Sequence, residues 1–202
     1  MIPQTILNTH DVREITNYLV QHWGLKQKDA KLNYVYLTNK KNKLFLMSRG
    51  LGKLVESDDL QNQNLRVERV GTYFGEQTDS GLRLTIEGSA LIGLLATKNV
   101  IEITNDELKE WWAGKNIVKE LDTKKEKVTE EGYLIVSYRN PKTKKLDFLG
   151  SGRYKSINGT WQILNYVPKI RRIQKQELLG ERKEVEVMGE GALETLGEGS
   201  KE

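Results

Sequence analysis

The sequence contains no cysteine and only two histidines, His10 and His22, among its 202 residues. The absence of thiols excludes disulfide bridges, thiolate metal sites and cysteine nucleophiles. With so few imidazole groups, we do not expect a histidine-built zinc site or a catalytic histidine relay. The sequence therefore predicts a protein without a cofactor or a metal site.

Long apolar runs are also missing. No segment approaches the roughly 20 apolar residues that a membrane-spanning helix requires, and residues 1–7 are too short and uncharged for a signal peptide. Hydrophobic residues make up 37% of the chain and charged residues 30%. This balance is polar for a globular protein but too apolar for general disorder. We expect a soluble, cytoplasmic protein with no membrane partner.

The net charge of +4 is unevenly distributed along the chain. Residues 176–202 contain eight acidic and three basic side chains, a net charge of −5, so residues 1–175 carry +9. A basic body favours a polyanionic partner, because phosphate neutralisation supplies most sequence-independent affinity for nucleic acids. Such a charge also occurs in proteins that are merely soluble. Our hypothesis for the acidic tail is that it screens the basic body when no RNA is bound.

Residues 1–97 combine helical and strand-like patterns and predict a first domain. Apolar side chains three or four residues apart predict an amphipathic helix over residues 11–23, capped near Thr9 or Asp11 and ended by Gly24. Further predicted elements are a hairpin of residues 32–38 and 43–48, a helical turn or two at 49–55, strands at 65–74 and 82–86 joined by a turn at 75–81, and a helix at 88–96.

Residues 98–175 predict a second domain built mainly of short strands. The expected elements are strands near 100–103, 117–118, 133–138, 146–154 and 161–167, with a helix from Thr104 or Asn105 to about Gly114. Many short strands with one small helix indicate a compact mixed β barrel within an α+β protein, not alternating βαβ units. The Gly/Glu-rich composition of residues 176–202 predicts a flexible acidic tail.

A search for catalytic motifs finds little. Residues 71–75 and 150–152 contain paired glycines but do not open a helix in the way a phosphate-binding loop does. Ser89 lacks the second glycine of a nucleophile elbow. Trp111 and Trp112 could form a stacking platform, but on a short helix we expect one to be buried and the other partly exposed. We therefore do not expect an enzyme.

The remaining signal is basic and aromatic. Arg153 and Lys155 are two residues apart in a predicted strand and therefore share one face. A second basic cluster, Lys169, Arg171 and Arg172, follows the last predicted strand and would approach them when a barrel closes. Such cations can contact phosphates while a nearby aromatic ring stacks a base, which indicates RNA binding. The alternative is a solvated basic edge that prevents strand-to-strand aggregation.

Four segments of the second domain resemble a PUA domain, the small RNA-binding barrel of pseudouridine synthases and archaeosine transglycosylases. The matching segments are residues 100–112, 113–118, 131–137 and the paired-glycine strand 148–153. The upstream match is stronger. Residues 43–48, 51–55, 70–75 (Val-Gly-Thr-Tyr-Phe-Gly) and 82–85 (Leu-Arg-Leu-Thr) resemble the N-terminal domain of the Nip-seven ribosome biogenesis family.

The resemblance covers residues from about 10 to 173 and implies an N-terminal α/β pre-PUA domain with an antiparallel sheet, followed by a PUA pseudo-barrel. It implies a non-enzymatic RNA-binding factor in large ribosomal subunit maturation, whose partners are rRNA or pre-rRNA. In the archaeal members, which this chain resembles, the PUA domain prefers U-rich or AU-rich single strands. The N-terminal domain would engage ribosome assembly or RNA-processing proteins. The family's RNA-contacting positions map to Arg153, Lys155, Lys169, Arg171 and Arg172.

Two alternatives stay open. The chain could be an RNA-modifying enzyme or its specificity module, with Asp79 as a candidate catalytic residue. It could also be a PUA-containing translation factor with the same order of domains, whose N-terminal domain contacts the small ribosomal subunit. The charged loop 122–131 and the acidic tail have no counterpart in the family.

Overall fold

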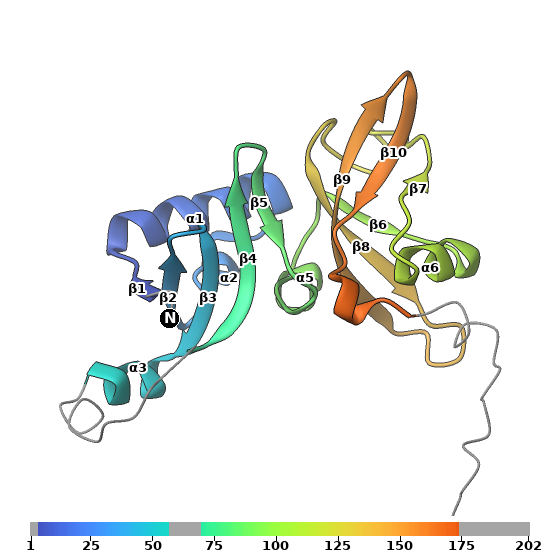
Figure 1. Cartoon of the computed structure of the whole chain (residues 1–202). Helices are drawn as coiled ribbons and strands as arrows, with labels where there is room; N and C mark the ends of the chain where they lie inside the picture. The colour runs from blue at the N-terminus through green and yellow to red at the C-terminus, as the bar shows by residue number, and fades with distance from the viewer. Residues whose placement is uncertain (1–3, 57–69, 174–202) are drawn as a thin grey trace, which may run out of the picture.

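The computed structural model describes residues 4–56 and 70–173, which form two five-stranded sheets. Figure 1 shows the sheets as two neighbouring lobes, with helix α5 (Ile86–Gly93) between them. The α+β class is thereby confirmed. The first sheet has the order β1 (Gln4–Ile6), β2 (Tyr34–Asn39), β3 (Lys43–Ser48), β4 (Thr72–Thr78), β5 (Gly81–Leu84). The second has the order β6 (Val100–Glu102), β8 (Tyr133–Arg139), β9 (Leu146–Ile157), β10 (Thr160–Asn165), β7 (Ile117–Val118).

The first sheet is antiparallel throughout, as predicted, and helix α1 (Thr9–Trp23) packs on one of its faces. The predicted helix is confirmed, but its cap is Asn8, whose side-chain oxygen accepts a hydrogen bond from the backbone N–H of Asp11 at 2.9 Å. Gly24 ends the helix with φ +68°, a left-handed conformation that glycine adopts without steric cost. The predicted hairpin of β2 and β3 is also confirmed.

The turn predicted at residues 75–81 was wrong in length. Strand β4 continues to Thr78, and only Asp79 and Ser80 separate it from β5. Polar residues concealed the strand, because Glu76 and Arg83 face each other across the hairpin and form an ion pair. The predicted strand at 82–86 ends at Leu84, and residues 65–69 of the other predicted strand lie outside the described residues.

The second sheet is mixed, because β6 pairs with β8 in parallel while the other neighbours are antiparallel. Within the described residues, no strand pairing joins the outer strands β6 and β7. The predicted helix is confirmed as α6 (Asn105–Trp112), with a capping box between Thr104 and Glu107. Strand β9 extends three residues beyond the predicted end at Tyr154.

Two of the buried clusters are large, and one of them joins the lobes. It contains Trp23 and Phe74 from the first lobe together with Tyr133 and Ile135 from the second. The other large cluster lies within the second lobe around Trp111, which is fully buried, whereas Trp112 is partly exposed, as predicted. The two sheets fall on either side of residue 97; the second lobe has a buried cluster of its own, and the other large cluster contains residues of both lobes.

Short helices complete the described fold: α2 (Gln27–Ala30), α3 (Arg49–Glu56) and the 3₁₀ turn η1 (Lys169–Arg171). Helix α3 confirms the predicted helical turns after the first hairpin. No helix among the described residues has both the length and the apolar character needed to cross a membrane. The predicted flexible tail, residues 176–202, lies outside the described residues.

Candidate nucleic-acid interface

The lobes are joined by hydrogen bonds around Tyr133. The Nε2–H of His22 donates to the Tyr133 carbonyl oxygen at 2.7 Å, and the Asn99 side-chain amide donates to the His22 carbonyl at 2.7 Å. The hydroxyls of Thr78 and Tyr133 lie 3.2 Å apart. Burial lowers the pKa of His22, although its bond to the Tyr133 carbonyl acts in the opposite direction. These bonds fix the relative position of the two sheets.

Strand β9 contains the two predicted cations, Arg153 and Lys155, and leads away from these hydrogen bonds. Alternate residues of a strand share a face, and here Ser151, Arg153 and Lys155 follow one another opposite the buried Tyr154. The Ser151 hydroxyl is buried and donates to the Leu84 carbonyl of the first sheet at 2.7 Å. Arg153 and Lys155 are half-exposed. The prediction that they share a face is confirmed, and the face becomes basic where it leaves the contact between the lobes.

An aromatic residue after β10 lies beside this face. The Arg83 guanidinium of the first sheet stacks 4.7 Å from the centroid of the Tyr166 ring, and the Tyr133 ring lies 6.0 Å from it on edge. Burial raises the pKa of Tyr166, and the neighbouring Tyr133 adds to this, while Arg153 and Arg83 act in the opposite direction. Tyr166 therefore stays protonated at neutral pH while two guanidinium groups lie near it.

Arg83 and Tyr166 line a cleft of about 480 Å³ between the lobes. Its walls come from the first sheet and α5 on one side and from β9 and the chain after β10 on the other. Ile170 of η1 lies at the cleft with 93% of its surface exposed. The volume lies within the range of small-ligand pockets and can accommodate a nucleobase. We call this cavity the interlobe cleft.

The three residues of the second predicted cluster, Lys169, Arg171 and Arg172, make different contacts. Lys169 is exposed and makes no ion pair with another described residue. Arg171 forms an ion pair with Glu87 of α5 across the interlobe cleft. Arg172 donates from Nε to the Val167 carbonyl at 2.9 Å.

Arg172 also packs tightly against Gly114, where an added Cβ atom would lie 2.4 Å from its Nε. Among the described residues, no hydrogen bond or ion pair connects Arg153 or Lys155 with this later cluster. Three of the five predicted residues, Arg153, Lys155 and Lys169, are therefore free of ion pairs in the described part of the chain. Arg171 forms an ion pair across the cleft, and Arg172 attaches the segment after η1 to Val167 and Gly114.

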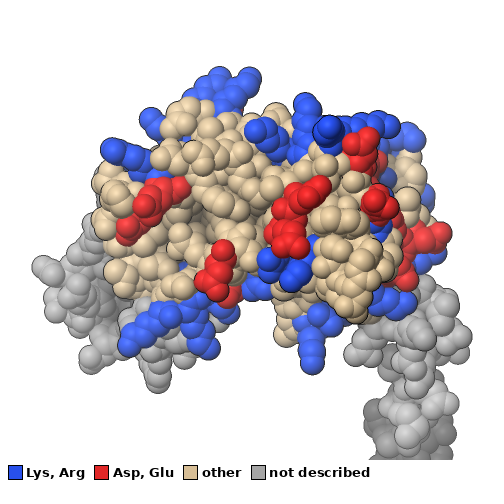
Figure 2. Space-filling model, turned by 90° about the horizontal axis from the view of Figure 1, so that it is seen from above, with Lys and Arg blue, Asp and Glu red and all other residues tan. Residues whose placement is uncertain are grey.

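The charges on the surface are mixed. Figure 2 shows one face of the molecule, where Lys and Arg side chains lie along both its upper and lower edges and acidic groups lie between them. Arg83 and Arg171 are both neutralised by glutamates, Glu76 and Glu87. Among the described residues, the cations of the candidate interface without an ion pair are therefore Arg153 and Lys155 on β9 and Lys169 in η1.

Sequence reasoning missed Arg83, Tyr166 and Ile170 as parts of this site. Their contribution depends on how the lobes are packed, which no local pattern reports. One signal was available for Arg83, which is a charged residue between Leu82 and Leu84 in a predicted strand and so had to face away from the core.

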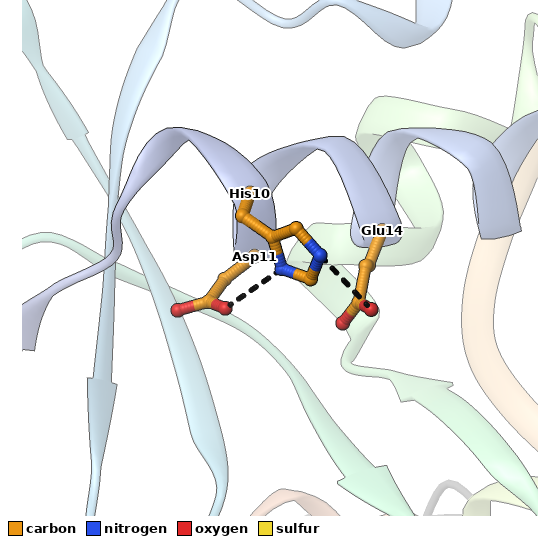
Figure 3. Close-up of side chains that lie close together, drawn as sticks. All are labelled: His10, Asp11 and Glu14. Atoms are coloured by element: carbon orange, nitrogen blue, oxygen red, sulfur yellow. Dashed lines mark ion pairs between the residues drawn. The ribbon is translucent and has the colours of Figure 1, made fainter.

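One cluster of possible metal ligands lies elsewhere, on the exposed first turns of α1. Figure 3 shows the His10 ring between two carboxylates, with Nδ1 3.6 Å from Asp11 and Nε2 3.9 Å from Glu14. One ring nitrogen and one oxygen from each acid lie within 4.8 Å of one another, but such groupings of exposed acidic side chains are common without a bound ion. The His10 side chain is 76% exposed. We interpret the cluster as a surface charge network.

Asp79, the residue considered for an enzymatic alternative, lies exposed in the turn between β4 and β5. It does not line the interlobe cleft. No family model matches the sequence, and no curated protein matches it. The resemblance to the Nip-seven family therefore remains a prediction that rests on the quoted residues.

Proposed function

We propose that this chain is a non-enzymatic protein that binds single-stranded RNA along β9 and the interlobe cleft. The observation that carries the proposal is the continuity of the β9 face: Ser151 lines the cleft and is covered by the first sheet, and Arg153 and Lys155 follow it on the same face of the strand. A strand of RNA would place phosphates on these cations and on Lys169 while one unpaired base enters the cleft. In this proposal the second lobe has the PUA pseudo-barrel fold and the first lobe is a pre-PUA domain.

Phosphate contact is chemically favourable at these three cations. None of them makes an ion pair with a described residue, so no such ion pair has to break before they meet a phosphate. Arg153 donates only a long bond of 3.4 Å, to the Glu131 carbonyl. A guanidinium group that lacks a carboxylate partner offers several donors to phosphate oxygens.

Base recognition would use the ring of Tyr166. Single-stranded nucleic acids bind through aromatic rings on which bases stack, combined with a positively charged track for the backbone. Arg83 already covers one side of this ring at 4.7 Å and can take part in a base–guanidinium–ring stack. The exposed side chain of Ile170 adds an apolar wall.

The test is fluorescence anisotropy of a short labelled U-rich RNA at several salt concentrations, with the variant R153A/K155A/K169A. For single strands the salt slope changes by about 0.7 per phosphate contact, so three lost contacts should make it shallower by about two. The matched control is K124A/K125A/K142A, which removes the same charge from exposed positions elsewhere in the second lobe.

Equal losses in both variants would reduce the effect to net charge and contradict the proposed interface. Unchanged binding in R153A/K155A/K169A would contradict it directly. Asp79→Ala should leave binding unchanged and, with RNA modification undetectable in the wild type, would argue against the enzymatic alternative.

A role in large ribosomal subunit maturation, with rRNA or pre-rRNA as the target, is part of the proposal and is supported by the resemblance alone. It predicts co-sedimentation with precursors of the large subunit. Co-sedimentation with small subunits would instead favour the translation-factor alternative.

A further inference from the structure

A second cavity lies on the first lobe, away from the interlobe cleft. It measures about 470 Å³ and lies among α1, α2, β2 and the start of α3. Figure 1 shows α1 and α2 next to each other on the same side of the first sheet. The two cavities have no lining residue in common. We call this second cavity the α1–β2 groove; its lining includes Arg13, Asn17, Gln27, Lys31, Tyr34 and Arg49.

The charged residues of the groove are all cations. Arg13, Lys31 and Arg49 come from three separate segments, and no acidic residue is among the residues that line the groove. None of the three makes an ion pair or a side-chain hydrogen bond with another described residue. The acids nearest in sequence to Arg13 are Asp11 and Glu14, and both lie against His10 instead. Three unpaired cations around one concavity favour an anionic ligand.

The other lining groups suit a base more than a simple anion. Asn17, Gln27 and Asn33 are exposed side chains, and each amide offers both donors and an acceptor to the edge of a base. Tyr34 is 39% exposed at the groove and has no aromatic partner among the described residues, so its ring is available for stacking. An inorganic anion would accept hydrogen bonds from the amide N–H groups but would use neither the amide oxygens nor the aromatic ring.

The wall of the groove also contains a buried polar atom without a partner. Tyr36 lines the groove and is 2% exposed, and its hydroxyl makes no hydrogen bond within the described part of the chain. Buried hydroxyls are normally paired, and each exception calls for an explanation. A ligand oxygen that reaches this hydroxyl would accept a hydrogen bond from it. Burial raises the pKa of Tyr36 to about 12, so the hydroxyl remains a donor at neutral pH.

From these observations we propose that the α1–β2 groove binds a nucleoside phosphate, with its phosphate on Arg13, Lys31 and Arg49 and its base against Tyr34. The nucleoside phosphate is either a free nucleotide or one nucleotide of a bound RNA strand. Only the second source rests on the proposed RNA-binding function. The cavity volume lies within the usual range for ligands of this size.

The test is calorimetric titration of the full chain with AMP, with UMP and with a short U-rich RNA. We expect R13A/K31A/R49A to weaken binding about tenfold or more, since charge-assisted hydrogen bonds are lost. We expect Tyr34→Leu, which keeps every charge, to weaken it at least about fivefold, because a stacked base is lost. The matched control, K124A/K125A/K142A, should bind as the wild type does.

The titrations with mononucleotides and with RNA distinguish a free nucleotide from one nucleotide of an RNA strand. Binding of AMP or UMP that is lost in the groove variants identifies a free nucleotide. Binding of RNA alone, weakened by the groove variants and weakened further by R153A/K155A/K169A, identifies a nucleotide of a longer strand. Unchanged affinity in R13A/K31A/R49A or in Tyr34→Leu overturns the groove proposal.

Two more results would overturn the groove proposal and leave the proposed function unaffected. In the first, the groove binds neither nucleotides nor RNA, while the interlobe cleft still binds RNA. The other is groove-dependent binding of an acidic peptide in place of nucleotides, which would make the groove a protein-docking site. Loss of RNA binding in R153A/K155A/K169A but not in the groove variants supports the interlobe cleft alone.

Discussion

At the scale of single residues, hydrogen-bond satisfaction distinguishes two buried tyrosines that the sequence does not distinguish. Tyr154 is 1% exposed and its hydroxyl accepts a bond from the Leu121 backbone N–H at 2.9 Å. Tyr36 is equally buried, but its hydroxyl has no partner among the described residues. The same chemical change should therefore have opposite effects at the two positions.

We expect Tyr36→Phe to raise the free energy of unfolding by about 1 kcal/mol, because it removes an unpaired buried hydroxyl. Tyr154→Phe should lower it by about 1–2 kcal/mol, because the Leu121 N–H loses its acceptor. Urea unfolding of both variants measures the difference. A loss of stability in Tyr36→Phe would show that its hydroxyl has a partner in solution.

Histidine protonation gives a second prediction at the residue scale. Burial lowers the pKa of His22 in the folded state below the value of 6.5 expected for the unfolded chain. Below about pH 6.5 the unfolded state therefore binds more protons, so His22 should decrease stability as the pH falls from 6.5 toward its folded pKa. Above pH 6.5 its contribution is constant.

Urea unfolding between pH 7 and pH 5 would measure this effect. His22→Gln should flatten the pH dependence in that window. Equal slopes in the wild type and His22→Gln would rule out His22 as the source.

At the scale of elements, α5 determines how closely the two sheets approach. A Cβ atom at Gly88 would lie 2.0 Å from the Phe74 carbonyl oxygen of β4, and one at Gly93 would lie 2.3 Å from the Phe148 ring of β9. Glycines at these two positions let the helix contact both sheets. The conformational cost of glycine in a helix is thus offset by packing.

Gly88→Ala should therefore destabilise the protein by at least about 2 kcal/mol, because the clash is with backbone. Gly50→Ala in α3 is the control, since a Cβ there meets nothing within 4 Å and alanine favours helix by about 1 kcal/mol. Thermal unfolding should move in opposite directions for the two variants. A neutral Gly88→Ala would mean that α5 does not hold the sheets at this distance.

At the scale of the whole molecule, the shared core predicts that both lobes unfold together. Ile135 belongs to the second sheet, is fully buried and packs in the cluster that contains α1 and the first sheet. Ile135→Ala should cost about 2–5 kcal/mol and lower amide protection from hydrogen exchange in β3 as well as in β9. Unchanged protection in β3 would show that the lobes unfold independently.

Local patterns in the sequence predicted much of the fold. The apolar spacing of α1 and the apolar and aromatic composition of β2 and β3 act over a few residues, and the corresponding helix and hairpin are present. The end of β4 was predicted poorly. Its strand character depends on the ion pair between Glu76 and Arg83 across the hairpin. The composition of either segment alone does not indicate this pair.

In the candidate site, too, some features follow from local sequence patterns and others depend on tertiary contacts. The sequence alone determined that Arg153 and Lys155 share a face, because strand alternation is a local property. Only the tertiary structure decided that Arg171 pairs with Glu87, that Arg172 anchors the chain against Gly114, and that Arg83 covers Tyr166. These contacts join residues far apart in the chain. The contacts of Arg171 with Glu87 and of Arg83 with Tyr166 also require that the burial of Tyr133 and Ile135 bring the two sheets together.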